Sequence, residues 1–171
     1  MEFYTQYARL TDEQYAAIGR VAVHWSLVET TIETILARLA YSPEYFGRAI
    51  TNDLGIDNRI RAIRTLCNVH EAQLGNRIVS RETVSQLRNL AAETAAKKGM
   101  RNRLVHSVWF RSTDEKMFGN KFRTGPAKRD QEEQRHLSQS FHEINQFAAE
   151  IEDLACRLGV ECEKLPKIEW P

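Results

Sequence analysis

The chain has 171 residues, of which 42% are hydrophobic and 27% are charged, and its net charge is +1. This length and composition are typical of one globular domain and exclude a predominantly disordered chain. No apolar run reaches the roughly 20 residues that cross a bilayer, and the first residues lack a basic start followed by an apolar block. We therefore expect a single domain over residues 1–171, in a cytoplasmic protein without a membrane segment.

The first predicted helix covers about residues 12–40. Thr11 and Gln14 have the capping-box spacing, in which each side chain satisfies a backbone N–H of the other residue. Apolar residues recur every three or four positions, as in a helix with one buried stripe: Ile18, Val21, Trp25, Val28, Ile32, Ile35 and Leu39. Ser42 and Pro43 have the chemistry of an N-cap and a first helical residue, which predicts a short helix after them.

Two further helices are predicted in the middle of the chain. One covers about residues 57–74, with Gly75 as its stop. The next begins after Ser80, and its residues 100–107 either continue it or start a new turn, depending on whether Gly99 bends or breaks it. Their apolar stripes are Ile56, Ile60, Ile63, Cys67, His70 and Leu74, and Val84, Leu87, Leu90, Ala91 and Ala95.

The pattern changes after the third long helix. Residues 107–112 are rich in β-formers and residues 116–122 form a weaker second strand, which predicts a β-hairpin. A polar loop over about 123–136 leads to the last helix, about 137–158, which Gly159 would stop. Its stripe is Leu137, Phe141, Ile144, Ala148, Ile151, Ala155 and Leu158.

These elements predict an all-α fold, an antiparallel bundle of four to five helices with a small β-hairpin inserted before the last helix. The hairpin and loop occupy about residues 107–136. An extended tail follows over residues 160–171, in which Ile168 and Trp170 are expected to pack on the bundle. The stripes of the first and last helices also suit coiled-coil-like packing against a second copy.

The three cysteines do not form a Cys-x-x-Cys pair, so neither a zinc site nor a disulfide framework is predicted. Cys67 and Cys156 fall on apolar stripes, where a buried thiol acts as a small hydrophobe. His70 and Trp25 also lie on apolar stripes and are expected to belong to the core.

The run from Arg101 to His106 has the most specific chemistry in the sequence. On a helix, Asn102 and His106 share one face, and Arg101 lies roughly 140° away around the axis, within reach of its long side chain. Imidazole exchanges protons near neutral pH, and guanidinium binds phosphate. Cleavage of a phosphodiester bond requires both a group that transfers protons and a group that binds the phosphate.

Basic residues concentrate around this run. Ten lie between residues 97 and 129, opposed by Asp114 and Glu115: Lys97, Lys98, Arg101, Arg103, Arg111, Lys116, Lys121, Arg123, Lys128 and Arg129. The part from residue 131 onward is acidic. This asymmetry indicates either a face that meets a polyanion or charges that neutralise each other within the fold.

The run resembles the signature of the HEPN superfamily, in which an Arg, commonly followed by a polar residue, precedes a His by a short gap. Here the gap is four residues and the polar residue is Asn102. The helical outline of about residues 12–158, with the motif late in the helical core, is similar to these domains. Trp25 and Glu29 in the first helix also resemble the opening helix of small bacterial and phage-associated proteins with such a motif.

The resemblance implies a metal-independent endoribonuclease that needs no cofactor and works as a homodimer, with two motifs in one cleft. His106 would act as general base on the ribose 2′-hydroxyl or as general acid on the leaving 5′-oxygen. Arg101 would bind the scissile phosphate and stabilise its developing charge, and Asn102 would orient the phosphate or His106. The RNA products would carry a 2′,3′-cyclic phosphate and a 5′-hydroxyl.

Other residues and partners are expected around this centre. Lys98, Arg103 and Arg111 are assigned to substrate binding, and Glu29 either steadies Arg101 or is exposed or paired elsewhere. The resemblance implies a toxin or antiphage effector, with an antitoxin or regulatory protein as a partner. Some HEPN toxins are modified on a Tyr two residues after the His, where this chain has Val108, so that control is not predicted.

Two other interpretations remain open. In one, the chain is a non-catalytic HEPN-like module that binds nucleotide, RNA or a protein partner. In the other, it is a small helical interaction protein in which Arg101 pairs with acidic groups of a neighbouring helix and His106 donates one hydrogen bond. The hairpin aromatics, among them Trp109 and Phe110, either stack RNA bases or cover the end of the bundle.

Overall fold

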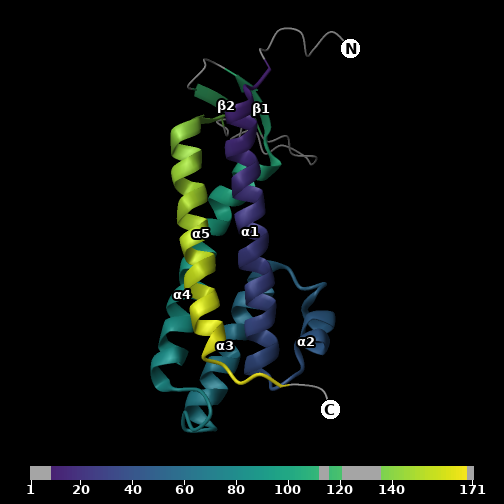
Figure 1. The fold of residues 1–171 in the computed structure, drawn as a ribbon, viewed down its shortest axis with the longest axis vertical. Coiled ribbons are helices and arrows are strands. Elements are labelled where there is room, and N and C mark those ends of the chain that lie inside the picture. Colours follow the sequence, from purple (N-terminus) through teal and green to yellow (C-terminus); the bar gives the residue numbers. More distant parts are fainter. Residues whose placement is uncertain (1–8, 112–115, 121–135, 169–171) are drawn as a thin grey trace, which may run out of the picture. The chain divides into compact units, whose positions relative to one another are not determined.

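The computed structural model describes residues 9–111, 116–120 and 136–168. They confirm the predicted fold class, an all-α bundle of five helices with a small antiparallel sheet before the last helix (Figure 1). The order is α1 (Asp12–Leu39), α2 (Glu44–Thr51), α3 (Ile56–Ala72), α4 (Arg81–His106), β1 (Val108–Arg111), β2 (Lys116–Asn120), β3 (His136–Ser140) and α5 (Phe141–Glu163).

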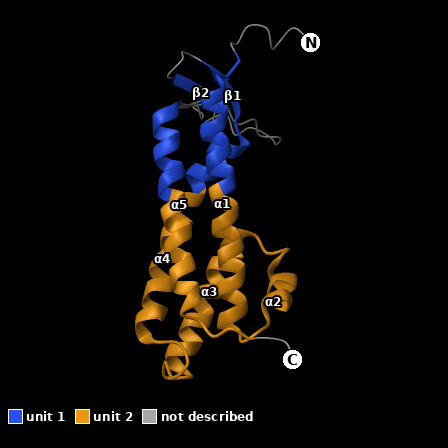
Figure 2. Ribbon diagram, in the orientation of Figure 1, with its two compact units in different colours: residues 1–23, 99–150 blue, residues 24–98, 151–171 orange. Residues whose placement is uncertain are grey.

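The chain divides into two compact units (Figure 2). Unit 1 comprises residues 1–23 and 99–150, and unit 2 comprises residues 24–98 and 151–171. Helices α1, α4 and α5 each contribute residues to both units. The sheet belongs to unit 1, whereas α2 and α3 belong to unit 2.

Helix α1 begins where the capping box predicts. The backbone N–H of Thr11 donates to Oε1 of Gln14 (3.0 Å), and the backbone N–H of Gln14 donates to Oγ1 of Thr11 (3.3 Å). Each side chain therefore satisfies a donor that the first turn leaves open. The predicted stripe is buried from Val21 to Leu39, and Ile18 is half-buried.

The core prediction for α3 is confirmed at His70, which is 1% exposed. Its Nε2 lies 3.0 Å from the carbonyl oxygen of Leu39 at the end of α1, and its Nδ1 lies 3.4 Å from the hydroxyl of Tyr41. A carbonyl oxygen accepts only, so Nε2 carries a hydrogen and donates to Leu39, while Nδ1 pairs with the tyrosine hydroxyl. His70 is therefore a packing residue with both ring nitrogens satisfied.

Helix α2 packs closely on α1 through a glycine. A Cβ at Gly47 would lie 2.1 Å from the Cβ of Ala37 and 2.7 Å from its Cα. These separations are shorter than any real contact between carbon atoms, so the two helices touch backbone to backbone at this point. The predicted helix start is shifted by one residue, because Pro43 is the N-cap and Glu44 is the first helical residue.

Helix α4 runs unbroken through Gly99 to His106, which resolves the two alternatives left open by the sequence. Apart from its chain neighbours and the nearby backbone of α4, no described residue approaches within 4 Å of the position that a Cβ at Gly99 would take. The predicted stripe is buried as far as Ala91. Ala95 is exposed, however, and Thr94 is buried in its place, with its hydroxyl donating to the carbonyl of Leu90 (2.8 Å).

The predicted bounds of the last helix are wrong at both ends. Residue Leu137 lies in strand β3, and α5 begins at Phe141. The start is fixed by a second capping box, in which the backbone N–H of Ser140 donates to Oε2 of Glu143 (2.7 Å) and that of Glu143 donates to Oγ of Ser140 (3.1 Å). Gly159 does not stop the helix, which continues to Glu163 with Cys162 buried on it.

The predicted hairpin is part of a three-stranded antiparallel sheet with strand order β1-β2-β3. Strands β1 and β2 pair Trp109 with Gly119 and Arg111 with Met117, and β3 then pairs with the other edge of β2. Met117 is fully buried. The predicted turn, most of the polar loop and Trp170 lie outside the described residues, and the third strand was not predicted.

The predicted burial is confirmed for one of the two cysteines and wrong for the other. Cys67 is buried as expected, whereas Cys156 is exposed and Cys162 is buried. The error at Cys156 arises because the buried residues around it on α5 are Leu154, Ala155 and Leu158, which place Cys156 on the opposite side of the helix. Burial raises the pKa of the Cys67 thiol, so that sulfur stays protonated.

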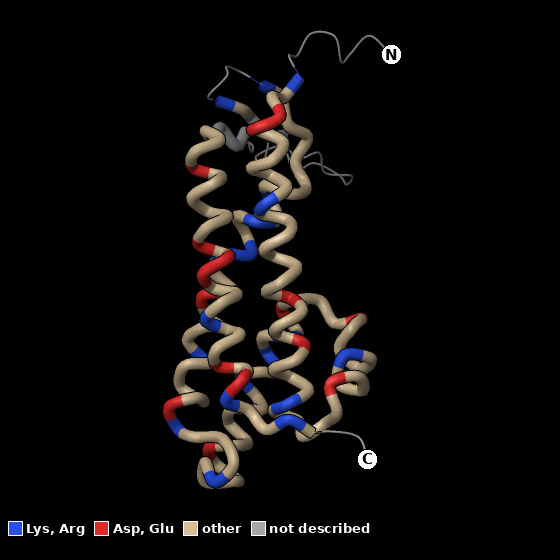
Figure 3. The backbone as a smooth tube through the Cα atoms, in the orientation of Figure 1, with Lys and Arg blue, Asp and Glu red and all other residues tan. Residues whose placement is uncertain are grey.

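Charged residues of both signs lie along the helices (Figure 3). In unit 2 many of them are ion-paired, including Arg59 with Glu33, Arg88 with Glu71 and Arg157 with Glu93. These pairs join α3 to α1, α4 to α3 and α5 to α4. Within the described ranges, no helix is both long enough and apolar enough to cross a membrane.

The contact between α1 and α2 predicts that replacing glycine by alanine changes the stability in opposite directions at positions 47 and 99. Gly47→Ala should destabilise the fold by about 1–3 kcal/mol, because a buried methyl group would be forced into Ala37. Gly99→Ala is the matched control within a helix. It should stabilise the fold by about 0.5–1 kcal/mol, because alanine is the better helix former where nothing obstructs its Cβ. Urea unfolding measures both, and equal effects of the two substitutions would contradict the assigned contact.

The pair between α5 and α4 predicts a specific acid sensitivity. Hydrogen bonds from Arg157, at 2.9 Å and 2.7 Å, hold the pKa of Glu93 below its ordinary value of 4.5. A carboxyl group with a lowered folded pKa stabilises the fold above its unfolded pKa, and this contribution is lost as the pH falls through the folded value. The free energy of unfolding should therefore fall less between about pH 5 and pH 3 in Glu93→Gln than in the wild type. Arg157→Met should flatten the profile equally, and a wild-type slope in that variant would remove Arg157 as the cause.

Candidate functional site

The last two turns of α4 bring together the three residues of the motif. Arg101 and Asn102 are half-buried, and His106 is exposed. Leu104, between them in sequence, is fully buried. The helix therefore has an apolar side that fixes it in unit 1 and a polar side that carries the titratable group.

The guanidinium of Arg101 makes contact with both other residues. Its Nη1 donates to Oδ1 of Asn102 at 2.9 Å and lies 3.5 Å from Nε2 of His106. The side chain thus bends toward the face of His106, as the spacing indicated. The amide of Asn102 also holds the guanidinium, and its predicted role in orienting the phosphate or the imidazole ring stays a prediction.

The contact between Arg101 and His106 has a chemical consequence. A guanidinium has donors and no acceptor. The approach of Nη1 to Nε2 is therefore a hydrogen bond only when Nε2 is unprotonated and the ring hydrogen lies on Nδ1. In that state, the lone pair of Nε2 faces a fixed positive charge. Together the three side chains, called the Arg101 cluster below, provide one proton acceptor, one cation and one orienting amide.

The residues assigned to substrate binding are placed differently from one another. Lys98 belongs to unit 2 and is ion-paired with Asp57. Arg103 is exposed, and its guanidinium lies 3.7 Å from the sulfur of Met100. Arg111 is half-buried at the end of β1. Arg103 and Arg111 therefore share unit 1 with the Arg101 cluster, while the charge of Lys98 is engaged in an ion pair.

Glu29 lies in the other unit. It is half-buried on α1 within unit 2, whereas Arg101 belongs to unit 1. The suggested pairing of Glu29 with Arg101 therefore stays a prediction.

The chain just after the motif contributes contacts that the sequence analysis did not assign. The indole Nε1 of Trp109 donates to the carbonyl oxygen of Leu104 (2.7 Å). The hydroxyl of Ser107 donates to the carbonyl oxygen of Arg103 (2.5 Å). Trp109 is therefore used in packing against the motif helix, which favours the structural alternative for this aromatic residue. The signal available in the sequence was a Trp three residues after a helix-terminal His.

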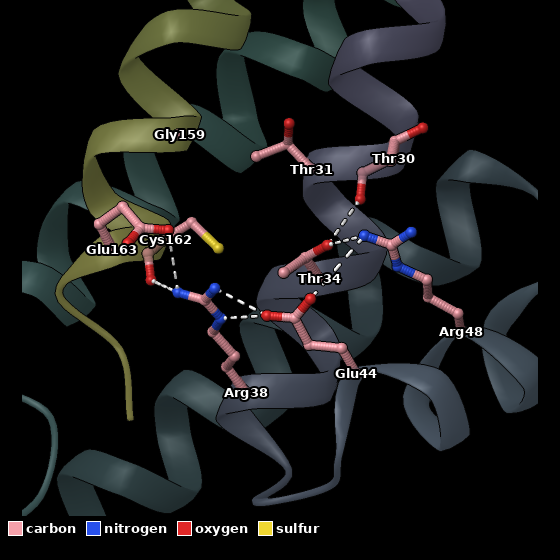
Figure 4. Close-up of a pocket in the computed structure, with 9 residues that line it drawn as sticks. All are labelled: Thr30, Thr31, Thr34, Arg38, Glu44, Arg48, Gly159, Cys162 and Glu163. Atoms are coloured by element: carbon pink, nitrogen blue, oxygen red, sulfur yellow. Dashed lines mark hydrogen bonds and ion pairs between the residues drawn. The ribbon is translucent and has the colours of Figure 1, made fainter. Parts of the chain in front are cut away.

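A polar cavity of about 300 Å³ lies in unit 2, apart from the motif in the sequence (Figure 4). Arg38, with a side chain 6% exposed, lies at its centre between α1, α2 and the end of α5. Its Nε and Nη2 donate to Oε1 of Glu44 at 2.9 Å and 2.7 Å, and its Nη1 donates to the carbonyl of Cys162 at 2.7 Å. Glu163 completes the set at 3.3 Å.

The groups of this cavity satisfy one another. Arg38 and Arg48 are opposed by Glu44 and Glu163, and Arg48 also donates to Oγ1 of Thr34 (2.9 Å). Burial acts to lower the pKa of Arg38, but the hydrogen bonds and charge of Glu44 outweigh it, so the group stays charged. The cavity is therefore a structural ion-pair network that joins three helices.

Neither the thiol of Cys162 beside this cavity nor any cluster of metal-ligating side chains indicates a second reactive site in the described residues. Burial raises the pKa of the Cys162 thiol, so its sulfur is a poor nucleophile. Among the residues that the structure describes, no three His, Cys, Asp or Glu side chains are placed to hold a metal ion.

Comparison of the chain with protein-family models, with curated proteins and with solved structures gave no match.

The cavity network predicts unequal roles for its two arginines. Arg38→Met should destabilise the fold by about 1.5–3 kcal/mol, because it removes charged hydrogen bonds and leaves the buried carbonyl of Cys162 without its donor. Arg48→Met, at a guanidinium 46% exposed, should cost about 1 kcal/mol or less. Thermal and urea unfolding of the two variants provide the measurement. Similar losses in both would show that Arg38 does not carry the junction of α1, α2 and α5.

Proposed function

We propose that this protein is a metal-independent endoribonuclease of the HEPN type. One observation carries the proposal: the guanidinium of Arg101 lies 3.5 Å from Nε2 of an exposed histidine, His106, on the same helix end. A cation beside an accessible proton acceptor is the minimum that cleavage of RNA through its own 2′-hydroxyl requires. The nucleophile belongs to the substrate, so the protein needs to supply only proton transfer and charge stabilisation.

The reaction uses each member of the Arg101 cluster. An imidazole takes the proton of the 2′-hydroxyl, and the 2′-oxygen forms a bond to phosphorus. The bond between phosphorus and the 5′-oxygen breaks, and that oxygen receives a proton from an imidazolium. Arg101 stabilises the negative charge on the nonbridging oxygens, and Asn102 keeps the guanidinium in place. The products are a 2′,3′-cyclic phosphate and a 5′-hydroxyl.

The proposal includes a homodimer. Proton removal and proton delivery occur at two different oxygens, and the Arg101 cluster contains one imidazole. A second protomer supplies the other imidazole when two clusters meet across a two-fold axis. We place the enzyme in the cytoplasm as a toxin or antiphage effector, with an antitoxin or regulatory protein as its partner. Arg103 and Arg111 of the same unit are assigned to binding the RNA backbone.

Cleavage of a labelled single-stranded RNA pool in EDTA tests the proposal. The wild type should produce ends with 2′,3′-cyclic phosphate. His106→Ala should lose at least about a hundredfold in kcat, the usual contribution of a positioned acid or base. Arg101→Ala should lose a comparable factor, because a stabilising charge contributes about as much. The rate should depend on pH with two limbs, one for the base and one for the acid.

The control is His142→Ala, which removes an exposed histidine of α5 in the same unit. It should cleave like the wild type, and all variants are compared at the same oligomeric state by light scattering. Equal cleavage by wild type and His106→Ala would reject the proposed site. Absence of cleavage by wild type on several RNAs, including transfer RNA, would favour the non-catalytic module that binds nucleotide, RNA or a protein.

A further inference from the structure

The end of α4 is held by side chains from the segment that follows it. The last four carbonyl groups of a helix have no partner within the helix. Here Arg103 and Leu104 are two of those four residues, and their carbonyls accept hydrogen bonds from Ser107 Oγ and Trp109 Nε1, respectively. Trp109 belongs to β1, so its bond ties the motif helix to the sheet.

The position of the Trp109 ring depends in turn on a glycine in β2. Strand pairing places Gly119 opposite Trp109. A Cβ at Gly119 would lie 3.1 Å from two ring atoms of Trp109, Cε2 and Cη2, and 2.9 Å from Cβ of Ser107. The indole and Ser107 therefore occupy the space that any other residue at position 119 would need. Both donors to the helix end lie against this one buried glycine.

This arrangement bears on His106 because the imidazole itself is exposed. Packing cannot fix an exposed ring, so its position relative to Arg101 follows from the backbone of the last helical turn. Helix ends open readily when their carbonyls are satisfied only by water. The hydrogen bonds from Ser107 and Trp109 oppose that opening on the two residues that precede Val105 and His106.

We propose that Trp109 and Gly119 are positioning residues for His106, so that the β1–β2 strand pair is a working part of the site. Gly119 leaves room for the indole of Trp109, and the indole hydrogen bond to Leu104 keeps the last turn of α4 helical. The helical turn in turn holds Nε2 of His106 beside Arg101. This inference rests on the proposed ribonuclease activity for its catalytic consequence, but the placement of the ring is measurable without activity. Neither Trp109 nor Gly119 touches the reacting atoms.

The Trp109 hydrogen bond to Leu104, with Gly119 packed against the indole, is called the clamp below. Two variants test the clamp in different ways. Trp109→Phe removes the N–H donor and keeps an aromatic ring, and Gly119→Ala pushes the ring and Ser107 away while keeping both donors. Val108→Ala, at a residue of β1 that is 40% exposed, is the matched control for general weakening of the strand. NMR spectra of full-length protein give the ring nitrogen shifts of His106 and the exchange rates of the amides at the end of α4.

Both test variants should shift the His106 ring signals and accelerate amide exchange in the last turn of α4, and Val108→Ala should do neither. In the cleavage assay, kcat should fall about tenfold to a hundredfold with little change in KM, because a small misplacement of a catalytic group has an effect of this size. Unchanged His106 signals in both variants would overturn the proposal. If Gly119→Ala fails to fold, the signals of Trp109→Phe decide alone.

The NMR and kinetic readouts separate this inference from the proposed function. Shifted His106 signals, in a protein whose wild type cleaves no RNA, would support the clamp and reject the ribonuclease. Normal cleavage by Trp109→Phe, in a wild type that is active, would reject the clamp and keep the ribonuclease.

Discussion

The candidate site depends on one constraint, the continuity of α4 through Gly99. Arg101 and His106 belong to successive turns, and their 3.5 Å contact exists only if both turns have helical geometry. Glycine inside a helix costs about 1 kcal/mol relative to alanine, so other contacts must hold the helix together beyond it. The buried side chain of Leu104 and the hydrogen bonds received by the Arg103 and Leu104 carbonyls supply that support.

Two arginines of the chain illustrate how the same side chain serves different purposes. Arg38 is almost completely buried, and its donors are directed to Glu44, Glu163 and a backbone carbonyl, so it joins helices. Arg101 is half-buried and directs one nitrogen to an amide oxygen and to an exposed imidazole. Opposite charges surround the first, whereas the second contacts an amide oxygen and an imidazole nitrogen.

The parts of the fold that repeat with helical period were predictable from the sequence. The stripe of α1 and the capping box at Thr11 are confirmed, because local spacing alone decides them. The start of α5 was missed although Ser140 and Glu143 have the same capping-box spacing. Residues 137–140 were assigned to the helix because Leu137 has helical spacing to Phe141. Over so few residues, the apolar pattern of a strand cannot be distinguished from that of a helix. The continuation of α5 past Gly159 was not predictable from the glycine alone, because Cys162 is buried beyond it.

The site was predictable in part. The spacing of Arg101, Asn102 and His106 was sufficient to expect them on neighbouring turns, since one helix fixes their separation. The bond from Trp109 to Leu104 and the fit over Gly119 were not predictable, because they depend on the register of two strands. The engagement of Lys98 by Asp57 likewise required the packing of α3 against α4, which no local pattern specifies.

The fit of Trp109 over Gly119 also constrains how related sequences can diverge. The two positions share one small volume, so a side chain at position 119 requires a smaller residue at position 109. A smaller residue there loses the indole N–H and leaves the Leu104 carbonyl to water. Divergence at these two positions is therefore expected to be paired, and it should follow whether the histidine at position 106 is retained. A chain that has lost the imidazole is free to fill the glycine position.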